Sequence, residues 1–529
     1  MALQLCFRHA RRRALRLSRV VPATASHVQL SFDRSPRAWF STKTLRIFNS
    51  LTNEVEPFLQ DEHDESNRPI RWYNCGPTVY DSAHLGHART YVCLDIMRRI
   101  LTKHFRLDVL YALGLTDIDD KIIKRANESP EVSSPLALAR RFETEFFEDL
   151  AKLGVELPDV VLRVTEHVDD IVDYVKLLEA KGFAYVNEAD NSVYFDVQAF
   201  NSANHSYGTM GPTSASLDTE EGRALHNADE GDESGLDRTL KRDPRDFVLW
   251  KAAKPDLEPA SVQWPSPWGL GRPGWHIECS AMSRAACGSH LDLHSGGIDL
   301  KFPHHCNEVA QSEAHNSAPR SCCPGHATDG QNGDPWARFF VHTGHLYIEG
   351  LKMSKSLKNF ISVRDLLENG FTADSFRMFC LQYSYRSSVH YSPDRMDEAN
   401  ALIRRVQNFL KVTDKHIQQA VIDGQELTKQ QCTEVTEEGK LAQTWCSKRW
   451  RLDEVRLRDS LSSHRAEIDS ALANDFDTPE ALQSLLKLTQ VRNALSLIVL
   501  LVPYLMRCIV ASSFSSCCRF VLMDLQDYV

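Results

Sequence analysis

The stretch 68–120 limits the fold more than any other part of the chain, because it contains two strand patterns on either side of a helical one. Residues 68–80 form an apolar segment that enters a turn, and residues 107–120 form a second one that ends in acidic residues. Between them, the apolar side chains of 87–105 recur at helical spacing. A strand–helix–strand unit places its strands in parallel, so the stretch predicts an α/β fold with a parallel sheet.

The chain has 529 residues, too many for one hydrophobic core, and its pattern changes beyond this unit. Residues 201–245 are rich in Ser, Gly, Asn, Asp and Glu, which is typical of a connective insertion. From Asp394 the apolar residues recur at helical spacing, which predicts a helical region interrupted by a polar loop over 414–447. A last helix is expected to begin at Pro479, with Thr478 as its N-cap.

The first 32 residues contain six arginines, no lysine and no acidic residue, although the whole chain carries a formal charge of −10. An arginine-rich segment without acids is typical of a mitochondrial transit peptide, which we place at 1–42. The alternative is a basic arm that binds RNA. A transit peptide predicts a mitochondrial matrix protein. That compartment is reducing, which agrees with fourteen cysteines that show no disulfide spacing.

Two stretches fit this organisation poorly. Residues 316–335 are a turn-rich run between two ordered segments, and 491–529 form an atypical apolar tail. The tail approaches the length of a membrane span, but Pro503 and Arg507 interrupt its apolar run. We therefore expect no stable membrane association.

The segment CGPTVYDSAHLGH, residues 75–87, contains a cysteine and two histidines, and its spacing alone fits either a metal site or a phosphate site. His84 and His87 lie between the predicted strand and the predicted helix, and Gly86 between them allows close approach of the backbone. A helix N-terminus attracts anions, so both histidines are candidates for binding phosphate. The ordinary alternative is two surface histidines beside a turn glycine.

The segment KMSKS, residues 352–356, is the second candidate phosphate site. Lys352 and Lys355 flank a short hydroxyl-bearing loop, which suits the stabilisation of charge on a polyphosphate during nucleotidyl transfer. A solvated basic loop is the ordinary alternative for two nearby lysines. The presence of the histidine motif on the same chain favours the functional interpretation.

Together, HLGH and KMSKS resemble the two signature motifs of class I aminoacyl-tRNA synthetases. Longer segments are similar to the cysteinyl-tRNA synthetase family in particular: YNCGPTVYDSAHLGHART, TDIDDKI, GRPGWHIECSAM, HSGGIDLKFPHHCNEVAQSEA and KMSKSLKNF. The resemblance covers roughly 44–200, 240–315 and 336–490. It implies ATP-dependent ligation of L-cysteine to tRNA(Cys) through a cysteinyl-adenylate, with Mg²⁺ accompanying ATP. The N-terminal extension indicates the mitochondrial form.

The resemblance also implies a domain organisation. A Rossmann-like catalytic domain with a parallel sheet would occupy 43–385 and would include the connective insertion. A helical tRNA-binding bundle would follow at 386–490. The transit peptide precedes these two domains, and the apolar tail, which does not resemble the family, follows them.

One zinc ion is the cofactor that the resemblance implies, bound by four side chains: Cys75, Cys279, His304 and Glu308. His304 and Glu308 are four residues apart, so on a helix that begins near Pro303 they share a face. Such a pair is ordinarily only a helical contact. His305 is the nearest rival ligand, whereas Cys306 points elsewhere and is expected to pack.

Zinc suits a site that must separate cysteine from serine, because the two amino acids are nearly isosteric. A soft metal site prefers a thiolate to a hydroxyl and lowers the pKa of the thiol. Selection by bond chemistry would make editing unnecessary. By the same resemblance, phosphate transfer would be stabilised by His84, His87 and Lys355. Further ATP-binding residues would be Gly86, Gly296, Gly297, Asp299 and Lys352. Cysteine-binding residues would be Gly76, Thr116 and Trp275.

Several alternatives remain at this point. A catalytically impaired isoform would keep the motifs, with the apolar tail and the 316–335 run disturbing tRNA charging. A non-catalytic RNA-binding paralogue would be expected to lose motif residues, and none is lost. A ligase that joins cysteine to an amine would lack the helical bundle, and a structural zinc protein would have no use for KMSKS.

Overall fold

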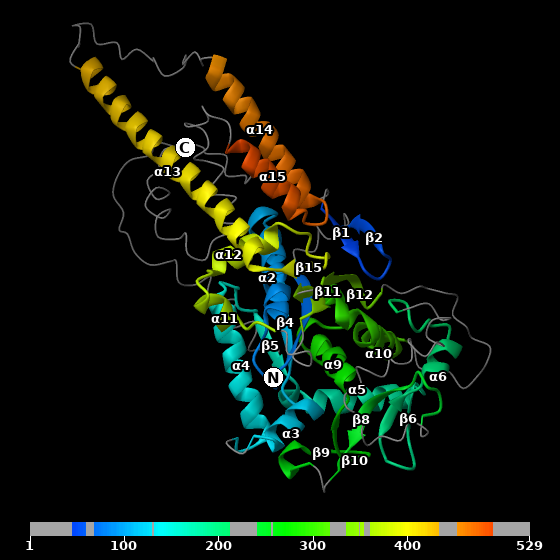
Figure 1. Ribbon diagram of the computed structural model, residues 1–529. Coiled ribbons are helices and arrows are strands. Elements are labelled where there is room, and N and C mark those ends of the chain that lie inside the picture. Colours follow the sequence, from blue (N-terminus) through cyan, green and yellow to red (C-terminus); the bar gives the residue numbers. More distant parts are fainter. Residues whose placement is uncertain are drawn as a thin grey trace, which may run out of the picture. The chain divides into compact units, whose positions relative to one another are not determined.

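Five parallel strands form the central sheet of the chain in the computed structural model (Figure 1), in the order β12–β11–β3–β4–β5. Every neighbouring pair in this sheet is parallel. The predicted strand–helix–strand unit is present, with helix α2 between β3 and β4. The bounds of the strands are β3 Ile70–Thr78, β4 Val109–Thr116, β5 Val160–Arg163, β11 Leu291–Gly297 and β12 Ala337–Thr343. The predicted α/β fold with a parallel sheet is confirmed.

The structure describes residues 45–59, 68–129, 132–211, 241–254, 258–317, 335–348, 350–353, 360–432 and 452–489. The chain divides into two compact units, 1–41 and 42–529, of which the structure describes only the second. The predicted transit peptide and the apolar tail therefore lie outside the described residues. Most of the 316–335 run and of the 201–245 insertion lies outside them as well.

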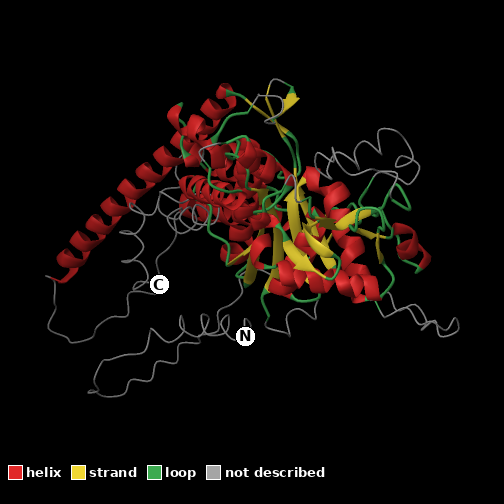
Figure 2. Cartoon of the chain, turned by 90° about the horizontal axis from the view of Figure 1, so that it is seen from below, coloured by secondary structure: helices red, strands yellow, loops and turns green. Residues whose placement is uncertain are grey.

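Helices cover both faces of the sheet because successive strand residues point to opposite faces (Figure 2). Trp72 of β3 packs in the cluster of α2, while the next residue, Tyr73, packs in the cluster of α9 and α10. Phe339 and Phe340 of β12 divide in the same way. The helices around the sheet are α2 Leu85–Arg99, α3 Asp120–Asn127, α4 Pro135–Lys152, α5 Val168–Ala180, α6 Val197–Ser202, α9 Trp275–Cys287 and α10 Cys306–Asn316.

Three further sheets accompany the central one among the described residues. An antiparallel sheet is built from β6 Ala184–Val186, β7 Val193–Phe195, β8 Phe247–Ala252, β10 Gly269–Pro273 and β9 Trp264–Ser266. The hairpin of β1 Arg46–Asn49 and β2 Glu54–Pro57 forms the second. The third contains β14 Leu351–Lys352, β13 Leu346–Ile348 and β15 Val389–Tyr391.

The predicted helical region shares its core with one face of the sheet. A single hydrophobic cluster joins α2 and α12 with Met396 of α13, Leu472 of α14 and Leu485 of α15. The predicted apolar stripe from Asp394 is confirmed, since Met396 and Val406 are buried. The bounds are α11 Val363–Glu368, α12 Ala373–Leu381, α13 Pro393–Cys432, α14 Leu452–Ala473 and α15 Thr478–Leu488.

Two local predictions in this region are wrong. The polar loop expected from residue 414 is helical as far as Cys432, because the Lys, Gln, Glu and Leu of this stretch favour a helix although they are mostly polar. The N-cap of α15 is Asp477 rather than Thr478, since the Asp477 carboxylate accepts the backbone N–H of Glu480 at 3.1 Å. Among the described helices, none is long and apolar enough to cross a membrane.

Candidate functional site

The site lies where the parallel strands end. Cys75 and Thr78 belong to the last residues of β3, Gly297 ends β11 and Thr343 ends β12. The carboxyl ends of the strands in an open α/β sheet form the usual ligand-binding edge. A cavity of about 360 Å³ opens here, and its lining includes seven predicted site residues besides Cys75. These seven are Gly76, His84, Gly86, His87, Trp275, Gly297 and Asp299.

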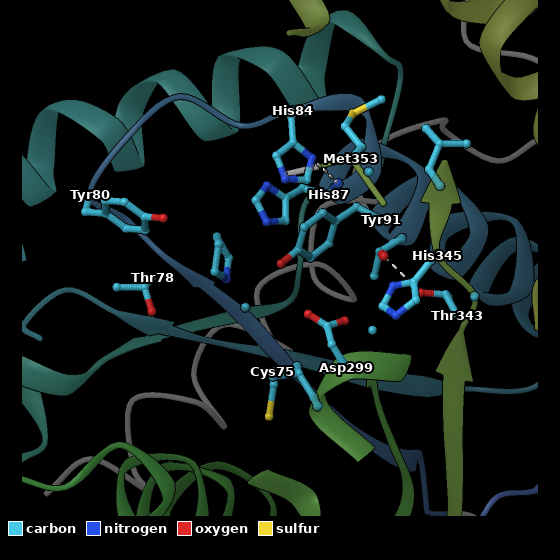
Figure 3. Close-up of a pocket in the computed structure, with 18 of the residues that line it drawn as sticks. Cys75, Thr78, Tyr80, His84, His87, Tyr91, Asp299, Thr343, His345 and Met353 are labelled. Atoms are coloured by element: carbon cyan, nitrogen blue, oxygen red, sulfur yellow. Dashed lines mark hydrogen bonds between the residues drawn. The ribbon is translucent and has the colours of Figure 1, made fainter. Parts of the chain in front are cut away.

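His84 and His87 form one wall of the cavity at the start of α2 (Figure 3). Their rings stack with centroids 3.8 Å apart. His84 is the N-cap of the helix, and its Nδ1 accepts the backbone N–H of His87 at 3.3 Å. A Cβ atom on Gly86 would lie only 2.8 Å from the His84 ring, so a glycine is needed there. The first turn of α2 thus presents a helix N-terminus and two imidazoles to the cavity.

Of the two predicted lysines, the structure describes only Lys352. Lys355 lies outside the described residues, and Lys352 belongs to the short strand β14, whose backbone pairs with Tyr347. The next residue, Met353, is buried and lines the cavity. The described part of the KMSKS segment, Lys352 and Met353, therefore reaches the wall of the cavity.

The predicted nucleoside and amino-acid residues divide into two groups. Gly297, Asp299 and Trp275 line the cavity. Gly296 does not, and a Cβ atom there would lie 2.8 Å from Leu300 Cδ1. Thr116 is buried and does not belong to the lining, and its hydroxyl donates to the Glu278 carboxylate at 3.0 Å.

Cys75, Cys279, His304 and Glu308 come together although they belong to four different elements. Their ligand atoms all lie within 4.8 Å of one another, and all four side chains are buried. The Cys75 sulfur is 3.5 Å from His304 Nε2 and 3.4 Å from Glu308 Oε1. His304 Nε2 is 2.9 Å from the same carboxylate oxygen. Two thiols, an imidazole and a carboxylate form a donor set that zinc prefers, so the cluster is consistent with a zinc site.

The electrostatics of the cluster favour bound positive charge. The hydrogen bond from Cys75 lowers the pKa of Cys279 to about 6. Burial would raise the pKa of Glu308, but His294 and His304 outweigh this effect and hold it at about 2. Burial would lower the pKa of His304, yet Glu308 and Cys279 raise it well above its usual value. The lowered pKa values of Cys279 and Glu308 and the raised pKa of His304 all favour positive charge beside the two acidic ligands, which a divalent metal ion can supply.

A second layer of histidines orients these ligands. His294 faces an acceptor on each side, with Nε2 at 2.9 Å from Glu308 Oε2 and Nδ1 at 3.1 Å from the Tyr73 carbonyl oxygen. The Nδ1 atoms of His276 and His304 are 2.9 Å apart, which leaves His304 Nε2 directed at the cluster. Such outer partners fix the orientation of metal ligands.

The rival ligand His305 belongs to a second group that could hold a metal ion: Cys75, His294, His305 and Glu308. His305 Nδ1 is 2.8 Å from His342 Nε2. The two groups share Cys75 and Glu308, but only the group with Cys279 has two sulfur ligands. Cys306 belongs to neither group and packs against Phe302, as expected.

The sequence interpretation did not single out several residues of the site. Tyr80, Tyr91, Lys121 and His345 line the cavity, and His294 holds a candidate ligand. Lys121, in α3, and His294, in β11, lie inside the conspicuous segments TDIDDKI and HSGGIDL. That position was the available signal, but the spacing did not indicate which side chains turn inward.

Comparisons with known proteins agree on the family. The profile described as "tRNA synthetases class I (C) catalytic domain" matches residues 62–401. The chain is 40% identical over 450 residues to a cytoplasmic cysteine–tRNA ligase of Dictyostelium discoideum, with 85% of this chain and 60% of the relative covered. It is 39% identical to a probable mitochondrial cysteine–tRNA ligase of Xenopus tropicalis, with 84% and 66% covered. A cysteine–tRNA ligase of Thermococcus onnurineus is 38% identical, with 85% and 80% covered.

The chain thus spans less than two thirds of the length of the first two relatives. Among solved structures, a methionyl-tRNA synthetase of Mycobacterium tuberculosis bound by methionyl-adenylate is similar with a TM-score of 0.53 and 16% identity, covering 83% of this chain and 85% of that one. That likeness shows a shared fold. The profile match, which includes all five strands of the central sheet, and the three ligase relatives place the chain in the cysteinyl-tRNA synthetase family of class I aminoacyl-tRNA synthetases.

Proposed function

We propose that the chain is a cysteine–tRNA ligase, which activates L-cysteine with Mg²⁺-ATP and transfers the cysteinyl group to tRNA(Cys). The observation that carries the proposal is the position of Cys75. It lines the cavity beside the stacked histidines and also belongs to the buried cluster that can hold a metal ion. Figure 3 shows its sulfur directed away from His84 and His87. One residue thus joins a candidate phosphate site to a site suited to sulfur.

Zinc fits the group Cys75, Cys279, His304 and Glu308, and when bound it would supply a soft Lewis acid that selects the thiol of cysteine over the hydroxyl of serine. Glu308 is held by His294, so the carboxylate that faces the cluster keeps its direction. Trp275, which lines the cavity, lies over the His304 ring at 4.4 Å between centroids. Its indole would exclude water beside the bound amino acid.

Adenylation needs no protein nucleophile in this scheme. The carboxylate of cysteine attacks the α-phosphate of ATP, and pyrophosphate leaves. His84, His87 and the first N–H groups of α2 would donate to the phosphate oxygens, with Lys352 and Lys355 supplying further positive charge. Asp299 would bind the nucleoside. The terminal hydroxyl of tRNA then takes the acyl group, and AMP leaves.

The assignment of domains and compartment belongs to the same proposal. Helices α13, α14 and α15 support a tRNA-binding role for 386–490, after a catalytic domain at 43–385. The composition of 1–42 supports a transit peptide and a matrix location. The relatives include cytoplasmic and mitochondrial enzymes, so import must be measured, for example with 1–42 fused to a fluorescent protein.

The deciding experiment is ATP–pyrophosphate exchange by the full chain and by a variant lacking 1–42. Exchange that depends on cysteine and not on serine, together with charging of tRNA(Cys), is expected. Exchange without charging would identify an impaired isoform. No exchange by folded, zinc-loaded protein would refute the ligase proposal and would favour an RNA-binding paralogue, which binding of tRNA alone would then reveal.

A further inference from the structure

The turn between α14 and α15 is tied to the sheet domain by a backbone hydrogen bond from Asp475 N–H to the Arg46 carbonyl at 2.8 Å and by the carboxylate of the same residue. Asp475 lies in this turn with a φ of 56°, and it is 9% exposed. Its Oδ1 accepts the backbone N–H of Phe48 at 2.8 Å and the hydroxyl of Tyr385 at 2.6 Å. Its Oδ2 accepts from Arg386 Nε at 2.8 Å. The carboxylate therefore joins the helical region both to the N-terminal hairpin and to the segment that follows α12 (Figure 1).

The segment after α12, residues 384–387, in turn contacts residues 343–345, which form one wall of the cavity. The backbone N–H of Gly344 donates to the Tyr385 carbonyl at 2.9 Å. A Cβ atom on Gly344 would lie 2.3 Å from the Ser387 carbonyl oxygen, so the two backbones are in close contact. Gly344 lines the cavity together with its neighbours Thr343 and His345. Any shift of 384–387 must therefore move this wall.

Arg89 connects the same segment to the histidine motif. It lies in α2, five residues after His84, and its side chain is buried. Its guanidinium donates to the carbonyl oxygens of Gly344 at 2.5 Å and of Ser387 at 2.9 Å. The adjacent Thr90 hydroxyl is 2.9 Å from that of Thr343. The helix that presents His84 and His87 is thus bonded both to the wall and to the 384–387 segment.

We propose that Asp475 is a positioning residue that couples the helical region to the cavity, acting through Tyr385 and Arg386 on the wall at 343–345. The inference rests on the proposed function, in which tRNA contacts the helical region and its acceptor end enters the cavity. Contact with tRNA at α14 and α15 then reaches the wall through two hydrogen-bonded joints. The coupling serves transfer of the cysteinyl group to tRNA, because only that step requires both regions to be engaged.

The substitution Asp475→Asn tests this coupling without changing the size of the side chain. Three donors face the two oxygens of Asp475, so an amide must turn its NH₂ group toward at least one donor. Asp477→Asn is the matched control, because it removes the same charge from the same turn. Asp477 caps α15, and asparagine is an equally good N-cap.

Two activity measurements separate coupling from general stability. We expect ATP–pyrophosphate exchange by Asp475→Asn to stay within about twofold of wild type, while single-turnover transfer from preformed cysteinyl-adenylate to tRNA slows about tenfold or more. Asp477→Asn should leave both steps within about twofold. Combined with Tyr385→Phe, Asp475→Asn should be non-additive, since both changes interrupt one path. An equal loss in both steps, or additive effects on transfer, would overturn the proposal.

Amide hydrogen exchange gives a readout that does not depend on activity. Asp475→Asn should increase exchange in peptides covering 343–346 and 84–91, whereas Asp477→Asn should leave the exchange of both peptides as in wild type. Unchanged protection at 343–346 would overturn the coupling, whatever the activity of the chain. Wild-type protein that neither exchanges pyrophosphate nor charges tRNA would instead refute the proposed function, so the two failures are distinguishable.

Discussion

Replacing His294 by asparagine should weaken zinc binding while leaving the fold intact. The side chain is fully buried, and its two nitrogens have different partners. An asparagine amide can reach the position of Nδ1 and keep the hydrogen bond to the Tyr73 carbonyl. It is too short to reach Glu308 as Nε2 does at 2.9 Å. The change therefore removes an outer contact of Glu308 and also one member of the alternative group with His305.

The expected loss follows from that single contact. Removing a partner that orients a metal ligand costs about 10–100-fold in affinity, which corresponds to about 1.4–2.7 kcal/mol. Glu308 also loses one of the two histidines that hold its pKa at about 2, so proton competition with zinc should increase in the same direction. The KM for cysteine should rise with it, because a less ordered carboxylate leaves the thiol site less defined.

Zinc affinity is measured by competition with a chelating dye at pH 7, beside circular dichroism to establish that the variant is folded. His290→Asn is the matched control, since it lies four residues earlier and belongs to neither group of candidate ligands. Wild-type zinc affinity in folded His294→Asn protein would refute the reasoning. A greater loss in His290→Asn than in His294→Asn would do the same.

Three further predictions concern other parts of the site and the sheet. Cys279→Ser should lower zinc content and raise the rate of serine-dependent relative to cysteine-dependent pyrophosphate exchange, because a soft ligand is lost; an unchanged ratio with zinc absent would contradict selection by the cluster. Gly86→Ala should lower kcat for exchange about 10–100-fold with little effect on stability, since its Cβ would displace the His84 ring at 2.8 Å; unchanged kinetics would show that the ring position is irrelevant. Burial would raise the pKa of Asp292, but Arg68 and Arg71 hold it well below its usual range. Its contribution to stability is therefore present above the ordinary carboxyl pKa of about 4 and is lost as pH falls below that value. Urea unfolding from pH 3 to 7 should then show a smaller acid-induced loss for Asp292→Asn than for wild type, and parallel curves would contradict the prediction.

The fold class was predictable because it depends on local periodicity. The strand and helix patterns of 68–120 correspond to β3, α2 and β4, and the stripe after Asp394 corresponds to α13. Where the prediction failed, a polar composition was taken as a sign of a loop. Lys, Gln and Glu also favour a helix, and α13 extends to Cys432 through this polar stretch.

The candidate site was only partly predictable. The residue types and their segments came from motifs, and the structure brings the four predicted zinc ligands together. Their partners His294 and His276 could not be inferred, because hydrogen bonds between distant segments leave no regular spacing. Thr116 stays a predicted cysteine-binding residue, and its hydrogen bond to Glu278 is a partner that the sequence did not indicate.

The sequence by itself determined which chemistry the chain can carry, since thiols, imidazoles and lysines in long specific motifs are properties of residue order. Only the tertiary structure decided which of them meet. Cys75 and Cys279 are separated by about two hundred residues, and parallel strand order alone brings β3 beside β11 and α9. The bonds from Arg89, and one of the bonds to Asp475, likewise go to backbone groups that every residue possesses. No sequence pattern marks such partners, because their identity depends on where the chain has already folded.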